Sequence, residues 1–177
     1  MAKQKTKLKE FFEGRRRQCE LQVINVLKNK AGERRIKMSV IMPLSGQPVT
    51  GMPDIFTEPY MLMQKEKSTL NFSKIDVAVN EAAFNIFSTD TIKSAAVSTN
   101  GTLLQGFRMI GEGSDDKRTV SLEFIVYTGY TMALRDWGCD HIHSEFWAEV
   151  APSQMELAEE APAPAKKGKK KQDELVQ

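Results

Sequence analysis

The sequence has few cysteines: among its 177 residues only Cys19 and Cys139 are cysteine, and they lie far apart. This excludes a disulfide framework and a zinc site built on neighbouring cysteine pairs. Because disulfide-rich proteins belong mainly to oxidising compartments, we expect a cytoplasmic protein. The sequence also lacks a run of roughly 18 apolar residues and a secretory signal, so we expect no membrane partner.

Catalytic motifs are equally scarce. The sequence contains no Gly-x-Ser-x-Gly motif and no phosphate-binding loop. The stretch Gly111–Ser114 resembles the start of a glycine-rich loop, but the later glycine and the helix that complete such loops are missing. The carboxylates of Asp115 and Asp116 are followed by Lys117 and Arg118, which is typical of a solvated loop. We therefore expect neither catalytic residues nor a cofactor.

The composition is otherwise that of a globular domain. Hydrophobic residues make up 41% of the chain and charged residues 27%, which is enough apolar material for a core. A chain of this length suits one domain. We place that domain at residues 18–155, between a basic flexible arm at 1–17 and a disordered tail rich in alanine, proline and lysine at 156–177.

Apolar and polar residues alternate through most of the domain, which predicts β-strands. The predicted strands are 19–27, 36–42, 70–79, 84–87, 92–99, 102–110, 120–126 and 146–150. A change of phase in the third of these predicts a β-bulge near Ser73 or Lys74. The pair Asn100-Gly101 predicts a tight hairpin turn, because both residues tolerate a positive φ.

Two short helices complete the predicted fold. Pro59 suits the first turn of a helix over 58–67. A second helix is predicted over 131–141, with Met132, Ala133 and Trp137 on one side and Trp137 in the core. The predicted fold class is α+β: a mainly antiparallel β-sheet or partly open β-barrel with two short helices and disordered basic tails.

The net charge of +2 hides a strong asymmetry. Residues 1–17 hold seven Lys or Arg against two Glu, a net +5, and residues 18–37 hold five against two, a net +3. Residues 38–155 hold eight against fourteen acidic residues, a net −6. A basic end on an acidic body is typical of an arm that binds an anionic partner.

The arm therefore predicts a nucleic-acid-binding site. Lysine and arginine neutralise phosphates, and phenylalanine stacks on unpaired bases. The candidate residues are Lys3, Lys5, Lys7, Lys9, Phe11, Phe12, Arg15, Arg16 and Arg17. A charged tail that only keeps the protein soluble is the simpler interpretation.

A second candidate site is the pair His141 and His143. A His-x-His pair on a strand points both imidazoles to one face, which suits a transition metal. The nearby side chains that could add ligands are Asp136, Cys139, Asp140 and Glu145. Alternatively, His141 stabilises the C-terminus of the preceding helix and His143 is a surface residue.

These patterns predict a non-catalytic accessory protein that binds nucleic acid, with a single strand favoured. The main alternative is a protein-interaction module, such as an assembly or inhibitor protein, whose acidic body binds a basic partner. A weaker alternative is a metal-dependent enzyme centred on the two histidines. The patterns do not specify an oligomeric state.

Overall fold

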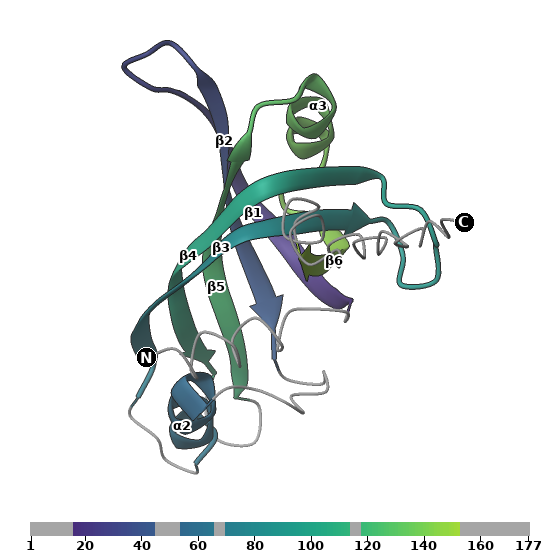
Figure 1. Ribbon diagram of the computed structural model, residues 1–177. Coiled ribbons are helices and arrows are strands. Elements are labelled where there is room, and N and C mark those ends of the chain that lie inside the picture. Colours follow the sequence, from purple (N-terminus) through teal and green to yellow (C-terminus); the bar gives the residue numbers. More distant parts are fainter. Residues whose placement is uncertain (1–15, 45–53, 66–69, 114–117, 153–177) are drawn as a thin grey trace, which may run out of the picture.

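The computed structural model describes residues 16–44, 54–65, 70–113 and 118–152 (Figure 1). These residues form six strands and two helices. The elements in chain order are β1 (Arg17–Lys28), β2 (Arg34–Pro43), α2 (Asp54–Met63), β3 (Phe72–Phe87), β4 (Val97–Glu112), β5 (Thr119–Gly129), α3 (Met132–Asp140) and β6 (Glu145–Pro152). The predicted α+β class, a mainly antiparallel sheet with two short helices, is confirmed.

All strand pairs are antiparallel, and the sheet closes on itself in the order β1-β2-β5-β4-β3-β6. Closure depends on a short pairing of β1 with β6, in which Arg17 lies opposite Ala148 and Glu20 opposite Glu145. Both partially open and flat sheets leave unpaired edges. In this ring the described strands each have a partner on both sides.

The alternation of side chains explains the core. In β2, Ile36, Met38 and Val40 are fully buried, while the residues between them are partly exposed. Strand β5 repeats the pattern, with Leu122 and Val126 inside. Successive side chains of a strand point to opposite faces, so one face of each strand fills the ring and the other faces outward.

The number of strands differs from the predicted seven or eight because two predicted pairs are continuous strands. The predicted strands 70–79 and 84–87 fall on β3 from Phe72 onward, and 92–99 and 102–110 fall on β4 from Val97 onward, with residues 92–96 in the connection between the two. The predicted hairpin at Asn100-Gly101 is therefore wrong. Gly101 does have a positive φ of 60°, but the register shift between Ala82 and Phe84 of β3 shows that it lies in a β-bulge.

The predicted bulge near Ser73 or Lys74 is also misplaced. Both residues keep regular pairing with β4, and the register shifts follow Ile75 and Val79. A further shift, between Gln105 and Arg108 in the pairing of β4 with β5, contains Gly106 with a φ of 67°. Each extra residue bends its strand and increases its twist. These bulges let strands of 16 residues curve around a small ring.

Helix α2 packs against one end of the ring. Phe56, Tyr60 and Met63 are its buried residues, and the ring of Phe56 lies 5.6 Å from that of Phe107. The helix begins four residues before the predicted start, so Pro59 lies inside it. Proline lacks an amide hydrogen and is best tolerated in the first turn, which is why the prediction began the helix there.

Helix α3 agrees with its predicted bounds to within one residue, but its buried side differs. Leu134 and Gly138 are buried, whereas Met132 and Ala133 are exposed. Trp137 is half-buried, with its ring edge-on to Phe146 at 5.3 Å. Trp137 therefore packs against the core and does not lie within it.

Strand β1 leaves the ring where its pairing with β6 ends at Glu20. From Val23 to Lys28 it pairs only with β2, and the two strands project as a hairpin (Figure 1). Helix α3 covers the inner side of this hairpin through Gly138 and Ile24. Neither helix in the described residues is long and apolar enough to cross a membrane.

Candidate nucleic-acid interface

Most of the predicted arm lies outside the described residues, namely Lys3, Lys5, Lys7, Lys9, Phe11, Phe12 and Arg15. Arg16 and Arg17 are described, and both make contacts within the domain. Arg17 is the first residue of β1 and is 5% exposed. Its role as an arm residue therefore has little structural support, because a buried guanidinium is not accessible to a phosphate.

Arg16 contacts the domain through three groups. Its guanidinium lies over the ring of Phe87, with 3.7 Å between Cζ and the ring centroid. Its Nε lies 3.6 Å from Glu149 Oε2, and its Nη1 donates to the carbonyl oxygen of Asp90. These contacts hold the start of β1 against β3 and β6. We interpret Arg16 as a structural residue that retains some accessible surface.

The two histidines do not lie on a strand, so the expectation of two imidazoles on one strand face is wrong. His141 is the C-cap of α3, where its Nδ1 is 2.7 Å from the carbonyl oxygen of Trp137 and its ring stacks on that indole. His143 has a φ of 62°, and its amide donates to Leu21 O at 2.7 Å. These contacts match the interpretation that His141 caps the helix.

The segment around His141 and His143 does not support the hypothesis of a metal site. In the described ranges, no three or more His, Cys, Asp and Glu side chains are grouped where they could hold one metal ion. The nearest charged partner of His143 is Glu20, with 3.9 Å between Nδ1 and Oε1. Two ligands at this separation fall short of the three or four that a zinc site needs.

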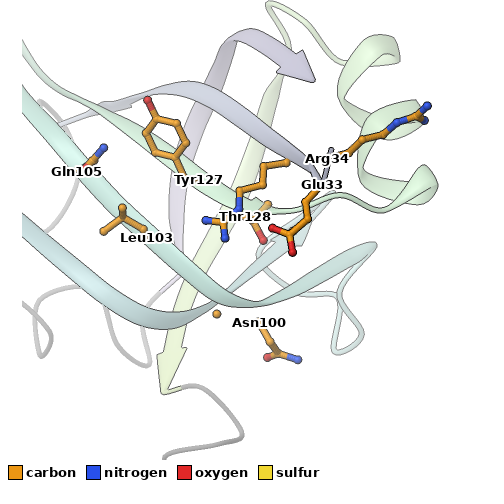
Figure 2. Close-up of a pocket in the computed structure, with 10 residues that line it drawn as sticks. Glu33, Arg34, Asn100, Leu103, Gln105, Tyr127 and Thr128 are labelled. Atoms are coloured by element: carbon orange, nitrogen blue, oxygen red, sulfur yellow. The ribbon is translucent and has the colours of Figure 1, made fainter. Parts of the chain in front are cut away.

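The outward side of β2, β5 and β4, with the adjoining part of β1, carries a different candidate site. We call it the outer face. A cleft of about 470 Å³ opens on it, a size within the range of small-ligand pockets. Its lining residues are Glu33, Arg34, Arg35, Asn100, Gly101, Leu103, Gln105, Tyr127, Thr128 and Gly129. In Figure 2, Tyr127, Leu103 and Gln105 lie together on one side and Glu33 on the other.

A smaller groove of about 220 Å³ continues the cleft along β5. Its lining residues are Val23, Asn25, Lys37, Ser39, Arg108, Glu123 and Ile125. Ile125 precedes Tyr127 by two residues and lies on the same face of β5. Same-face residues of a strand are about 6.6 Å apart, so the cleft and the groove lie next to each other, and we refer to the two together as the depression.

Strand pairing explains why these side chains meet. Lys37 of β2 and Leu103 of β4 both lie opposite Tyr127 of β5. One step along the strands, Ser39 and Gln105 lie opposite Ile125. Side chains directly opposite on one face are close enough to interact. The outer face is thus a regular array with Tyr127 and Ile125 at its centre.

Positive charge is concentrated in this depression. Four cations line it, Arg34, Arg35, Lys37 and Arg108, against the carboxylates of Glu33 and Glu123. By contrast, residues 38–155 as a whole carry a net −6. The Lys37 ammonium lies 5.8 Å from the centroid of the Tyr127 ring, a cation–π distance that keeps charge beside an aromatic surface.

Glu123 holds Arg108 at the edge of the groove. The Arg108 guanidinium donates to Glu123 Oε1 through Nη2, and Ser39 Oγ donates to the same oxygen at 3.2 Å. The Arg108 side chain is 45% exposed, whereas that of Glu123 is 12% exposed. The carboxylate therefore orients a guanidinium whose remaining N–H groups face outward.

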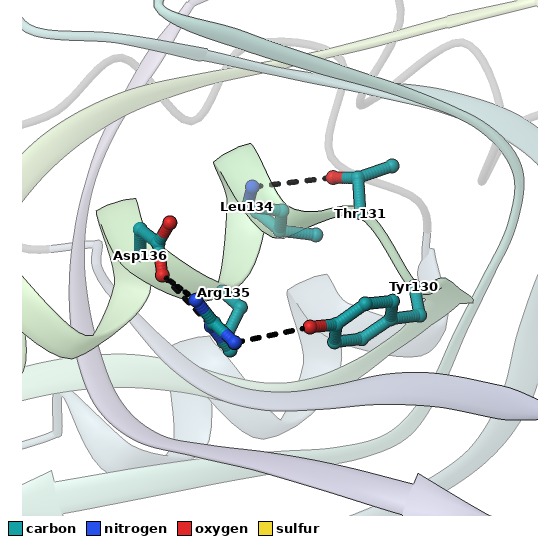
Figure 3. Close-up of polar contacts among 5 residues, drawn as sticks. All are labelled: Tyr130, Thr131, Leu134, Arg135 and Asp136. Atoms are coloured by element: carbon teal, nitrogen blue, oxygen red, sulfur yellow. Dashed lines mark hydrogen bonds and ion pairs between the residues drawn. The ribbon is translucent and has the colours of Figure 1, made fainter.

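Helix α3 stabilises the rim of the cleft next to Arg34. The Arg34 guanidinium lies 5.5 Å from the Tyr130 ring centroid, and Arg135 Nη1 donates to the Tyr130 hydroxyl at 3.2 Å (Figure 3). The hydrogen bond to Asp136 raises the pKa of Arg135. Thr131 is the N-cap of α3, and its hydroxyl accepts from the Leu134 amide at 3.2 Å, which satisfies an N-terminal donor of the helix.

Part of this site could be predicted from the sequence. Arg35 and Lys37 occupy the polar positions between buried residues of β2, and Tyr127 does the same in β5. Such alternation places them outward. That β2 and β5 are neighbours, with β4 next to β5, depends on long-range pairing that the alternation does not specify.

Comparison with known protein families, with curated proteins and with solved structures gives no match for this chain. Its functional interpretation therefore rests on the chemistry and placement of its own side chains. In the described residues, the outer face is where cations, an aromatic ring and a concave surface coincide.

Proposed function

We propose that this protein is a non-catalytic accessory protein that binds single-stranded nucleic acid on its outer face. The observation that carries this proposal is the depression lined by Arg34, Arg35, Lys37 and Arg108, with the ring of Tyr127 in the wall of the cleft and Lys37 beside it. Proteins that bind single strands combine a positively charged groove, which follows the backbone, with aromatic side chains on which bases stack. Both parts are present here on one curved sheet.

A single strand fits this surface better than a duplex. The depression is concave and its aromatic ring is half-buried between neighbouring side chains. Proteins that recognise double-stranded DNA usually insert a helix or a β-ribbon into one of its grooves. Unpaired bases can instead turn toward the protein and stack on a side-chain ring.

The predicted arm would add to this affinity. Lys3, Lys5, Lys7 and Lys9 supply further positive charge on the same chain. Phosphate contacts from lysine are independent of sequence and strongly dependent on salt. In this proposal the outer face binds and orients the strand, and the arm increases the rate and strength of association.

The test is a fluorescence-anisotropy titration of the full-length chain with a labelled single-stranded oligonucleotide at several salt concentrations. The logarithm of affinity should fall with the logarithm of salt concentration, with a slope of about −0.7 per phosphate contacted. Arg35→Ala and Lys37→Ala should each weaken binding and flatten this slope by about one contact. Unchanged binding in the double variant would remove the outer face from the proposal.

Lys93→Ala is the matched control. Lys93 is exposed and lies in the connection between β3 and β4, and β3 ends beside β6 on the far side of the ring from β2. It should bind as the wild type does. Replacing the four arm lysines with glutamine in the full-length chain separates the arm from the face. Absence of binding at low salt would contradict nucleic-acid binding altogether.

Protein interaction is the second candidate, and one specific observation favours it. The hairpin of β1 and β2 exposes Val23, Val26 and Leu27, which are 46%, 45% and 43% exposed. Val23 and Leu27 lie on the same face of β1, opposite Ser39 and Arg35 of β2, and neighbouring exposed apolar side chains often mark a protein-binding surface. If Leu27→Lys leaves nucleic-acid binding unchanged but abolishes self-association, the hairpin has this separate role.

A further inference from the structure

We infer that the cleft beside Tyr127 holds one unpaired base and prefers adenine and cytosine to thymine and uracil. Adenine and cytosine carry an exocyclic amino group on the edge away from the glycosidic bond. This inference rests on the proposed function. It adds a base preference to a binding mode that phosphate contacts alone would leave independent of sequence.

The first step concerns the floor of the cleft. Tyr127 is half-buried on β5, with Leu103 opposite it on β4 and Ile125 next to it on the same face. Lys37 lies over the ring from the β2 side, and because Tyr127 is only half-buried, part of its side chain is accessible to a base. Stacking on such a ring is tolerant of sequence because every base has a π-face. Tyr127 thus supplies binding affinity but does not discriminate between bases.

The second step concerns the hydrogen-bonding groups around that floor. Gln105 lies diagonally across from Tyr127, opposite Ile125, a separation that long side chains can span. Its amide offers one acceptor and two donors. In the described part of the chain, no hydrogen bond is made by this amide, so it is available to the edge of a base stacked on Tyr127.

The third step concerns Glu33 on the other side of the cleft (Figure 2). Asn29 Nδ2 donates to Glu33 Oε2 at 2.8 Å, and the Glu33 amide donates back to Asn29 Oδ1 at 2.9 Å. This pair of bonds holds the carboxylate at the rim. An ionised carboxylate can only accept hydrogen bonds, so a ligand group facing it must be a donor.

These groups favour an amino-bearing base. Adenine and cytosine present an amino group where thymine and uracil present a carbonyl oxygen. A carbonyl oxygen facing Glu33 would leave two acceptors opposed without a proton between them, which is a repulsive contact. The same carboxylate repels phosphates, so the base lies between Tyr127 and Glu33 while the phosphates lie along Arg35, Lys37 and Arg108.

The experiment compares labelled oligo-dA, oligo-dC and oligo-dT of equal length, titrated against the full-length protein at one salt concentration. We expect oligo-dA and oligo-dC to bind about tenfold more tightly than oligo-dT, as is typical of one well-placed base contact. Glu33→Gln introduces a donor and should raise the affinity for oligo-dT. Gln105→Ala should weaken all three oligonucleotides, because its amide can donate or accept and so does not by itself discriminate between bases.

Tyr127→Ala should weaken all three oligonucleotides by a similar factor, and Tyr127→Phe should restore their binding. Equal affinity of the wild type for all three, with binding still reduced by Lys37→Ala, would overturn the base preference and leave the proposed function standing. No binding of any oligonucleotide at low salt would overturn both. A Glu33→Gln variant that still rejects oligo-dT would overturn the role of Glu33, and thermal melting establishes that each variant is folded.

Discussion

Gly138 of α3 lies directly against Ile24 of β1: a Cβ atom added to Gly138 would be 2.2 Å from Ile24 Cδ1. The close approach lets the helix cover the part of β1 that has left the ring. Gly138→Ala should lower the free energy of unfolding by up to about 2 kcal/mol, because overpacking costs about 1–3 kcal/mol and the better helix propensity of alanine offsets about 1 kcal/mol. Urea unfolding measures this difference.

Two further variants test the cause. Gly129→Ala is the control, because no heavy atom lies within 4 Å of the added Cβ. Ile24→Val removes the Cδ1 atom that would collide, so the double variant with Gly138→Ala should be more stable than Gly138→Ala alone. If the second substitution gives no rescue, α3 does not pack against β1 as the structure shows.

Gly101 tests the bulge in β4. Its φ is 60°, and an added Cβ would contact nothing within 4 Å, so only the backbone restricts substitution. Gly101→Val should cost about 1–2 kcal/mol, because a β-branched residue resists the left-handed region. Gly101→Asn should cost clearly less, since asparagine adopts this region more readily. Equal losses in urea unfolding would argue against a positive φ.

The same glycine shows why part of the fold was not predictable. A hairpin turn and a β-bulge both need residues with positive φ, so Asn100-Gly101 is compatible with either. The choice depends on β3, which pairs with β4 on both sides of Gly101, through Ala82 with Thr102 and Phe84 with Thr99. Such pairing is non-local, and the local sequence does not contain it.

By contrast, β2 and β5 could be predicted because their alternation is unbroken. Each strand has one buried face with apolar residues, and no bulge interrupts their pairing with each other. The candidate site follows the same division. Alternation predicts which residues of β2 and β5 face outward. That Tyr127 lies near Gln105 depends instead on β4 lying next to β5, which alternation does not predict.

A chain of buried hydroxyl groups offers a third stability test. Thr102 Oγ1 lies 2.8 Å from Thr99 Oγ1 and 3.2 Å from Thr128 Oγ1, and all three residues are buried. Thr102→Val keeps the shape but removes the central hydroxyl. It should cost about 1–3 kcal/mol, because the buried Thr128 hydroxyl then loses its donor, whereas Thr99 keeps its hydrogen bond to the carbonyl oxygen of Phe84.

Replacing all three threonines with valine should cost less than the sum of the three single substitutions. Apolar groups of the same shape leave fewer buried hydroxyls without a partner. A double-mutant cycle on Thr99 and Thr102, measured by urea unfolding, gives the coupling. Strictly additive losses would show that the three hydroxyls do not form one network.

Cys19 provides a prediction about pH and thiol chemistry. It is 1% exposed, and burial raises the pKa of its thiol to about 12, with Arg17 acting in the opposite direction. Cys139 is exposed. The reactive form of cysteine is the thiolate. A thiol reagent at neutral pH should therefore modify one cysteine per folded chain, and Cys139→Ser should abolish that reaction, whereas both thiols react in urea.

The raised pKa of Cys19 also has a definite sign for stability. A thiol that ionises near pH 9 when unfolded and near pH 12 when folded keeps its proton longer in the folded protein. Its contribution is complete below pH 9 and is lost as the pH rises toward 12. Between these values the wild type should lose up to about 1.4 kcal/mol per pH unit relative to Cys19→Ala. Parallel pH profiles for the two proteins, measured by urea unfolding, would show that Cys19 is accessible to water; Cys139→Ala, which removes an exposed thiol, should follow the wild-type profile.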